Sequence, residues 1–244
     1  YRKLNYNQKV FPVTQFEKLE FEKIKLSEIE VLEQTHYDKL KNIQRPKFRF
    51  FLDTHNNDLI IVTVTGNVKI IKDNNFSKIQ NINSNLLNLN NVQVFDIKVI
   101  DNFLYVSLDI SKEEVDCKYF SLYRATIKER DLNFEKVFDP NKCIKNNYGG
   151  RITSAIVNNE EGIVLTTGAT EEEAIQAQND DSHLGKVLFL GKNSSTPKIV
   201  SKGHRNPQGL FAEGSLILTT EHGPYGGDVI NKIMIILTIE GTFP

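Results

Sequence analysis

A short loop near the C-terminal end of the sequence concentrates side chains that bind anions. Residues 203–210 read Gly-His-Arg-Asn-Pro-Gln-Gly-Leu, so Arg205, Asn206 and Gln208 flank a proline. The proline fixes one backbone angle, and the guanidinium and amide N–H groups are planar donors that can converge on one ligand. This loop therefore predicts a binding site for a small anionic molecule.

A second loop follows, at residues 221–231, and has the composition of a metal-binding turn. It contains Gly223, Pro224 and Asp228 among further glycines. Backbone carbonyls and a carboxylate are the oxygen ligands that calcium prefers, although glycine and proline are also the commonest residues in plain turns. Because the donor-rich loop lies so close in the sequence, we favour the metal interpretation.

The elements that must position these loops are predicted to be β-strands. From residue 48 onward, short runs rich in β-branched and aromatic residues alternate with clusters of Asn, Asp and Gly. The runs are 48–52, 59–65, 68–72, 92–99, 103–108, 120–127, 134–138, 151–157, 162–167, 186–190, 198–200, 209–212 and 215–220. Their spacing is typical of an antiparallel all-β fold such as a sandwich, barrel or propeller.

A weak internal repeat favours the propeller among these folds. An apolar run, a short polar turn and a second run ending near Thr or Ser recur at 50–64, 97–108, 152–167 and 210–220. Several strands in each repeat of roughly 45–60 residues are what a propeller blade needs. We predict that residues 1–47 form a leader that packs on the outside and that 48–244 form the propeller domain.

Two segments between the runs have another composition. The Asn-rich residues 81–91 are expected to be loops, with Leu86, Leu87 and Leu89 tucking against a blade as the alternative. The acidic stretch 171–178 is expected to be a short, solvated helical turn.

Charge and composition exclude some classes of partner. The chain has 30 Lys and Arg against 31 Asp and Glu, so nothing in its charge predicts binding to nucleic acid. It contains no run of about 18 apolar residues that would predict a membrane span. Cys117 and Cys143 are compatible with a disulfide or with two buried thiols.

Four motifs in order resemble the soluble pyrroloquinoline-quinone-dependent aldose sugar dehydrogenases, also called the glucose/sorbosone dehydrogenase family. They are the two loops together with Gly149-Gly150-Arg151 through Gly168 and the segment from Ala177 to Leu188. The resemblance is strong over residues 148–231. It implies a six-bladed β-propeller with the quinone in a cleft near the central axis.

The resemblance also implies roles for the two loops. Arg205, Asn206 and Gln208 hold the cofactor, pyrroloquinoline quinone, while the carbonyls of Gly223 and Pro224 bind a calcium ion. Asp228 supports the calcium shell. The implied reaction oxidises a small aldose sugar to its lactone and passes electrons to an external acceptor, in a periplasmic or secreted protein.

The sequence departs from the family pattern in its chemistry. The general-base histidine of the family matches Asn147, whose amide does not accept a proton at any useful pH. Val229 stands where an acid is usual, and His183, His204 and His222 are expected to be structural. Enzyme activity is therefore uncertain, and the alternative is a catalytically silent propeller that binds a sugar or a protein partner. A lactonase-type calcium propeller explains Arg205 to Gln208 less well.

The family pattern stops after Asn231. The following residues, 232–244, do not match the turn and further blades that the family continues into. We therefore expect a C-terminally truncated member, a fragment with about four blades.

Overall fold

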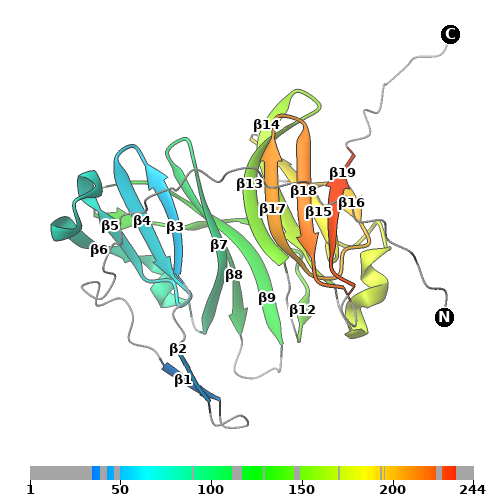
Figure 1. The fold of residues 1–244 in the computed structure, drawn as a ribbon, viewed down its shortest axis with the longest axis horizontal. Coiled ribbons are helices and arrows are strands. Elements are labelled where there is room, and N and C mark those ends of the chain that lie inside the picture. The colour runs from blue at the N-terminus through cyan, green and yellow to red at the C-terminus, as the bar shows by residue number, and fades with distance from the viewer. Residues whose placement is uncertain are drawn as a thin grey trace, which may run out of the picture.

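The computed structural model describes the part of the chain that carries both loops. The described residues are 35–38, 43–46, 50–89, 91–111, 117–128, 130–145, 149–169, 171–192, 194, 196–223 and 227–234. In these residues the fold is all-β, with only four short 3-10 helices beside the strands (Figure 1). Those helices are η3 (Lys72–Asn74), η4 (Phe76–Lys78), η5 (Asn85–Asn88) and η6 (Glu171–Ala177).

Four sheets follow one another along the chain. In spatial order, the first sheet contains β10 (Asp131–Leu132), β6 (Ile79–Ser84), β5 (Val68–Ile71), β4 (Asp58–Thr63) and β3 (Phe50–His55). The second contains β11 (Glu135–Phe138), β9 (Lys118–Thr126), β8 (Phe103–Ser111) and β7 (Val92–Ile100), and β12 (Cys143–Ile144) also pairs with β9. The third contains β13 (Gly149–Val157), β14 (Glu160–Thr167), β15 (Lys186–Gly191) and β16 (Lys198–Lys202). The fourth contains β17 (Pro207–Glu213), β18 (Leu216–Glu221) and β19 (Val229–Ile233).

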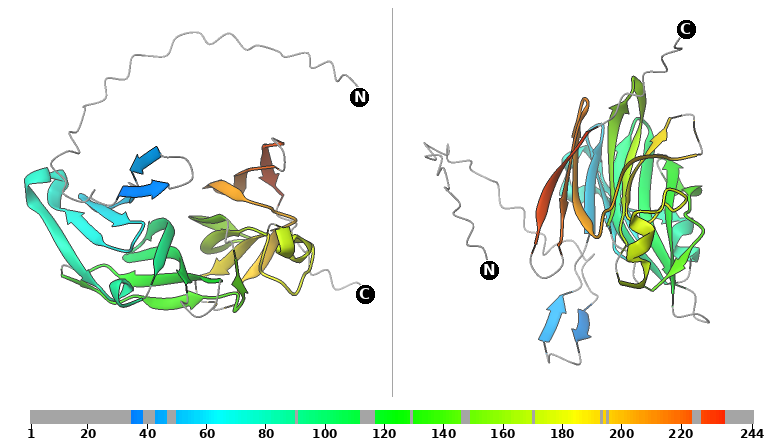
Figure 2. Two further views of the ribbon diagram at one scale, coloured as in Figure 1. Left: turned by 90° about the horizontal axis from the view of Figure 1, so that it is seen from below. Right: turned by 90° about the vertical axis from the view of Figure 1, so that its right-hand side faces the viewer.

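Each of these sheets is built on an antiparallel meander of sequential strands. The pairs of non-consecutive strands are the parallel β10–β6 and the antiparallel β11–β9 and β12–β9. A separate hairpin joins β1 (Thr35–Asp38) to β2 (Ile43–Pro46). The first strands of the four sheets, β3, β7, β13 and β17, contact one another in series. Figure 2 shows the sheets following an arc. This is the arrangement of propeller blades around an axis, so the predicted fold class is confirmed, and six remains the predicted number of blades in the family.

The cores explain why these runs are apolar on both faces. One cluster of buried residues lies between the first and second sheets, another between the second and third, and another between the third and fourth. In β14, for example, Val164 faces one cluster and Leu165 the next. A strand covered on both faces needs continuous Val, Ile and Leu rather than simple alternation.

Each of the thirteen predicted runs overlaps a strand within the described residues, but the prediction that the Asn-rich segment forms loops was wrong for residues 81–88. Residues 79–84 form β6 and 85–88 form η5. Leu86 is buried in the first core and Leu87 is exposed. Burial of Ile82 and Leu86 outweighs the turn preference of the asparagines around them. The sequence also did not predict β1, β2 or β19.

Two further expectations meet the structure here. Cys117 and Cys143 form a disulfide, with 5.4 Å between their Cα atoms, which ties the beginning of β9 to β12. The helical turn at 171–178 is present as η6. The predicted leader lies mainly outside the described residues, so its packing stays a prediction. Across the residues that are described, the search for a helix long and apolar enough to span a membrane finds none.

Candidate functional site

Strand register brings the predicted loops to one end of the sheets. In the third sheet Gly149 lies opposite Thr167, and in the fourth Pro207 lies opposite Glu221, which in turn lies opposite Val229. The chain segments that leave and enter the strands at this end are therefore neighbours. Loops at the end of a rigid sheet are the usual place for ligand groups.

The loop between β16 and β17 is fixed to the third sheet by backbone hydrogen bonds. The N–H of His204 donates to the carbonyl of Gly185 at 3.1 Å, and the N–H of Ala169 donates to the carbonyl of Arg205 at 3.0 Å. Gly203 has φ of +92°, a conformation that favours glycine. The loop thus leaves β16 through a turn that its sequence permits and that neighbouring loops hold.

A buried lysine holds the loop against which residue 203 packs. The ammonium of Lys186, which is fully buried, donates to the carbonyls of Gln176, Ala177 and Leu184 at 2.8, 3.0 and 2.8 Å. The carbonyl of Ala177 also accepts the N–H of Gly203 at 2.9 Å. Because three carbonyls satisfy the buried ammonium, its position is structural.

Arg151 connects the first strands of three sheets. From β13 its Nε donates to the Gln208 carbonyl at 2.7 Å, its Nη1 to the Phe95 carbonyl of β7 at 2.9 Å, and its Nη2 to Gln208 Oε1 at 3.2 Å. The guanidinium therefore sets both the backbone and the side-chain position of Gln208. Gly150, with φ of +79°, is needed beside it, since an added Cβ would lie 2.7 Å from the Phe95 Cβ.

The amides of the candidate loop are linked to this arginine. Gln208 Nε2 donates to Asn206 Oδ1 at 2.5 Å, so the order of contacts is Arg151, Gln208, Asn206. The Asn206 Nδ2 atom donates to no group among the described residues. Arg205 Nη1 donates to the His222 carbonyl at 3.3 Å and leaves the other guanidinium N–H groups without a protein acceptor there. Free donors thus remain on Arg205 and Asn206.

Glu221, at the start of the second loop, binds the first loop through hydrogen bonds. Its Oε1 accepts the backbone N–H groups of Arg205 and of Asn206, the latter at 3.1 Å, and its Oε2 lies 3.1 Å from His204 Nδ1. Asn231 Nδ2 also donates to Oε2 at 3.2 Å. The side chain of Glu221 is only 9% exposed. Burial by itself would raise the pKa of Glu221, but the hydrogen bonds from these donors outweigh it and leave the pKa lowered.

The second loop is closed by Asp228. Its Oδ1 accepts the N–H of Gly223 at 3.1 Å, and its Oδ2 lies 3.3 Å from His222 Nδ1. A Cβ on Gly223 would lie 2.0 Å from the carbonyl oxygen of Gly227, so only glycine allows this close approach. Asp228 therefore holds the turn that presents Gly223.

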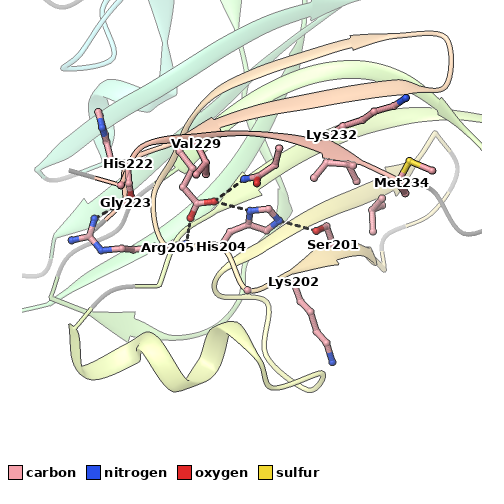
Figure 3. Close-up of a pocket in the computed structure, with 15 residues that line it drawn as sticks. Ser201, Lys202, His204, Arg205, His222, Gly223, Val229, Lys232 and Met234 are labelled. Carbon is pink, nitrogen blue, oxygen red and sulfur yellow. Dashed lines mark hydrogen bonds and ion pairs between the residues drawn. The ribbon is translucent and has the colours of Figure 1, made fainter. Parts of the chain in front are cut away.

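Two cavities adjoin this junction. One of about 590 Å³ is lined by β16, β19 and the candidate loops, and Figure 3 shows Arg205 and His222 at one end of it and Lys232 and Met234 at the other. A smaller one of about 230 Å³ is lined by residues that include Gln208, His222 and Asp228. The larger volume is within the range of small-molecule sites.

The predicted site residues divide into two groups. Arg205, Asn206, Gln208, Gly223 and Asp228 come together at this end of the third and fourth sheets. Asn147 and Pro224 lie outside the described residues. In the described part of the chain, no group of three or more His, Cys, Asp and Glu side chains could hold a metal ion.

Sequence reasoning assigned no role to Arg151 or Glu221. Each belongs to a motif that was noted, but Gln208 lies 57 residues after Arg151, and Arg205 lies 16 residues before Glu221. Only the strand register brings these partners together in space. A polar residue directly after an apolar strand run, as Glu221 follows 216–220, was the available signal. His204 was expected to be structural, and its buried contact with Glu221 agrees.

Comparison with known proteins matches this set of motifs to one family. The model of the family described as "Glucose / Sorbosone dehydrogenase" matches residues 47–235, which include all four sheets. The chain belongs to the glucose / sorbosone dehydrogenase family. The resemblance inferred from the loops is therefore confirmed, and the family match reaches well beyond them.

Two curated relatives match over shorter segments. An uncharacterised protein of Synechocystis sp. is 38% identical over 73 residues, covering 24% of this chain and 18% of the relative. Quinoprotein glucose dehydrogenase B of Acinetobacter calcoaceticus is 35% identical over 75 residues, covering 26% of this chain and 16% of the relative. The chain thus spans less than a fifth of either relative in these matches.

Solved structures give only distant matches. A complex of S. cerevisiae Dbp5 with Nup159 and Gle1 has a TM-score of 0.37 at 13% identity, covering 73% of this chain and 53% of that one. An exo-1,5-alpha-L-arabinanase from a bovine ruminal metagenomic library has a TM-score of 0.30 at 8% identity, covering 75% and 91%.

Proposed function

We propose that this protein is a quinone-dependent sugar dehydrogenase that oxidises an aldose to its lactone. The family membership supports the reaction class. The observation that carries the proposal for this chain is that Arg205, which lines the cavity of about 590 Å³, and its neighbour Asn206 each keep N–H donors that no described residue accepts. A fixed cationic donor next to a free amide suits an anionic, oxygen-rich cofactor.

The donor set fits pyrroloquinoline quinone, which carries carboxylates and quinone oxygens. Arg205 binds a carboxylate through its free guanidinium N–H groups, and Asn206 donates from Nδ2. Gln208 orients Asn206 through its 2.5 Å hydrogen bond and adds its remaining N–H. When bound, the quinone supplies the acceptor for the hydride that leaves C1 of the sugar. An external acceptor then takes up the electrons.

A calcium ion in this proposal lies at the second loop. The carbonyls of Gly223 and Pro224 are the proposed ligands, and further oxygens come from the cofactor and water. Asp228 supports them by binding the Gly223 N–H, which fixes the direction of the peptide units in the turn. Its exposed carboxylate also adds negative charge near the ion.

Removal of the proton from the sugar hydroxyl is the step for which this chain lacks a suitable base. Asn147 precedes β13 by two residues, in the sequence position of the family's general base, and an amide does not take up a proton at neutral pH. The C1 hydroxyl proton then passes to water. We therefore expect turnover to be slow even when the cofactor is bound.

The test is aldose-driven dye reduction by the purified full chain supplied with pyrroloquinoline quinone and calcium. We expect slow, quinone-dependent reduction, and we expect Asn147→His to raise turnover by about a hundredfold or more while quinone affinity stays the same, since general-base catalysis contributes ~10²–10⁴-fold. A chain that retains quinone but reduces no dye, with or without the histidine, is the silent binding protein instead.

The setting of the proposed enzyme follows from other features. A periplasmic or extracellular location agrees with the Cys117–Cys143 disulfide, since such bonds persist in oxidising compartments. The balanced charge supports a small sugar rather than nucleic acid as the substrate. We also propose that residues 1–47 form a leader that packs on the outside of the propeller domain, residues 48–244.

A further inference from the structure

One oxygen atom of Glu221 binds two consecutive backbone N–H groups of the candidate loop. Oε1 accepts from Arg205 and from Asn206, and these are the two residues with unused donors. The carboxylate comes from the end of β18, next to the second loop, so it joins both proposed ligand loops through one side chain. No role in the proposed chemistry requires Glu221 to touch the cofactor.

The other oxygen of Glu221 is held by His204. Because a carboxylate only accepts hydrogen bonds, His204 Nδ1 is the donor across 3.1 Å. The Nε2 atom lies 2.9 Å from Ser201 Oγ, which donates to it when the ring is neutral. Asn231 Nδ2 also donates to Glu221 Oε2, at 3.2 Å. The side chain of His204 is only 6% exposed.

The order Ser201, His204, Glu221 is also that of a nucleophilic triad, but it lacks the groups that acyl transfer needs. An oxyanion must be met by N–H donors close to the nucleophile. The backbone N–H groups of Gly203 and His204, which follow Ser201 in the chain, donate hydrogen bonds to the carbonyls of Ala177 and Gly185 and so do not serve an oxyanion. The described contacts therefore fit a structural link and not a hydrolase.

We propose that Glu221 is a positioning residue for quinone binding and that His204 fixes its orientation. This inference rests on the proposed function. Two N–H groups held by one oxygen determine where the side chains of Arg205 and Asn206 leave the backbone. Without that acceptor, both N–H groups lose their partner, and among the described residues only the backbone N–H groups that donate to the carbonyls of these two residues still restrain this backbone, so the donors no longer meet the cofactor in one arrangement.

The first variant is Glu221→Gln, which keeps the shape and removes the charge. Its Nε2 would face the donors of His204 and Asn231, so the amide fits this environment poorly. We expect the dissociation constant for pyrroloquinoline quinone to rise by about tenfold or more, the change that ~1.4 kcal/mol produces. The turnover number at saturating quinone stays within about twofold of the unaltered chain.

A matched control and a conservative rescue separate positioning from general damage. Glu213→Gln makes the same chemical change at the opposite end of β17, where the side chain is exposed, and leaves quinone binding unchanged. His204→Gln keeps an N–H donor for Glu221, so it weakens quinone binding less than His204→Ala does. If Glu221→Gln does not fold, the comparison of His204→Gln with His204→Ala still tests whether Glu221 positions the quinone-binding donors.

Amide hydrogen exchange on the full chain without quinone gives a second readout. We expect the N–H groups of Arg205 and Asn206 to exchange faster in Glu221→Gln than in the unaltered chain, at a temperature where both proteins are folded. Unchanged exchange at both, or quinone affinity within twofold of the unaltered chain, overturns the inference. If the unaltered chain does not bind quinone, the proposed function fails. The difference in amide exchange between the unaltered chain and Glu221→Gln then tests the positioning role by itself.

Discussion

At the scale of single residues, Arg151 connects the candidate loop to neighbouring sheets. Its three hydrogen bonds reach Phe95 of β7 and both the carbonyl and the side chain of Gln208 of β17. Gln208 in turn fixes Asn206. The planar guanidinium is required because its donors point in three set directions, which a lysine ammonium does not reproduce.

We expect Arg151→Lys to lower the free energy of unfolding by about 1–3 kcal/mol, because partly buried acceptors on β7 and β17 lose their donors. Urea unfolding followed by circular dichroism measures this loss. The exposed Arg130 provides the control, and Arg130→Lys is expected to change stability by less than about 0.5 kcal/mol. Equal effects of the two substitutions would contradict the role assigned to Arg151.

At the scale of elements, Asp96 links β7 to β13. Its Oδ2 accepts the N–H of Ile152 at 3.0 Å and its Oδ1 accepts the N–H of Ile97 at 3.0 Å. Burial raises the pKa of Asp96, although these N–H groups and the charge of Arg151 oppose the effect. The junction between the second and third sheets is therefore sensitive to pH.

The sign of that dependence follows from linkage. The folded chain keeps the Asp96 proton at a pH where the unfolded chain, with the ordinary pKa of about 3.8, has released it. This contribution to stability is therefore lost as the pH rises from that value through the raised pKa of the folded state. We expect Asp96→Asn to flatten this part of the pH profile of unfolding.

Urea unfolding at a series of pH values, for the unaltered chain and for Asp96→Asn, gives the comparison. The exposed Asp181 serves as the control, and Asp181→Asn is expected to leave the profile unchanged. If Asp96→Asn shows the same pH dependence as the unaltered chain, the assignment to Asp96 is wrong.

Strand runs were predictable from sequence because a strand that is buried on both faces has consecutive apolar residues. Runs such as 162–167 in β14 contain consecutive apolar residues, Ile163 to Leu165, and turn residues bound them. β6 escaped prediction because its sequence, Ile-Gln-Asn-Ile-Asn-Ser, has turn-forming residues on its exposed face. β19 escaped because it directly follows the Gly-rich turn and its first residues are exposed.

The candidate site was predictable only in part. Arg205, Asn206 and Gln208 were found because they are adjacent in sequence and their donors are evident from residue type. Arg151 acts through backbone carbonyls of other strands, and Glu221 acts through backbone N–H groups of the loop before β17, which residue type does not reveal. The contact between Glu221 and two N–H groups depends on the pairing of Pro207 with Glu221, and no local pattern specifies that register.

At the scale of the whole molecule, repetition of sheets converts distant motifs into one site. The first strands of successive sheets lie in series (Figures 1 and 2). The two proposed ligand loops meet where the third and fourth sheets adjoin. The sheets are rigid and the loops carry the donors, as in other sites built on β-scaffolds. This architecture supports binding of one small molecule at this end of the molecule.

The central claim is that Arg205 binds a carboxylate of pyrroloquinoline quinone. Equilibrium dialysis of the quinone against the full chain, with calcium present, tests it most directly, using the unaltered protein and Arg205→Met. We predict saturable binding at one site and a dissociation constant raised by about tenfold or more in Arg205→Met, since bonds to charged groups are worth ~1.5–3 kcal/mol. No saturable binding by the unaltered chain, or equal affinity in both proteins, would contradict the claim.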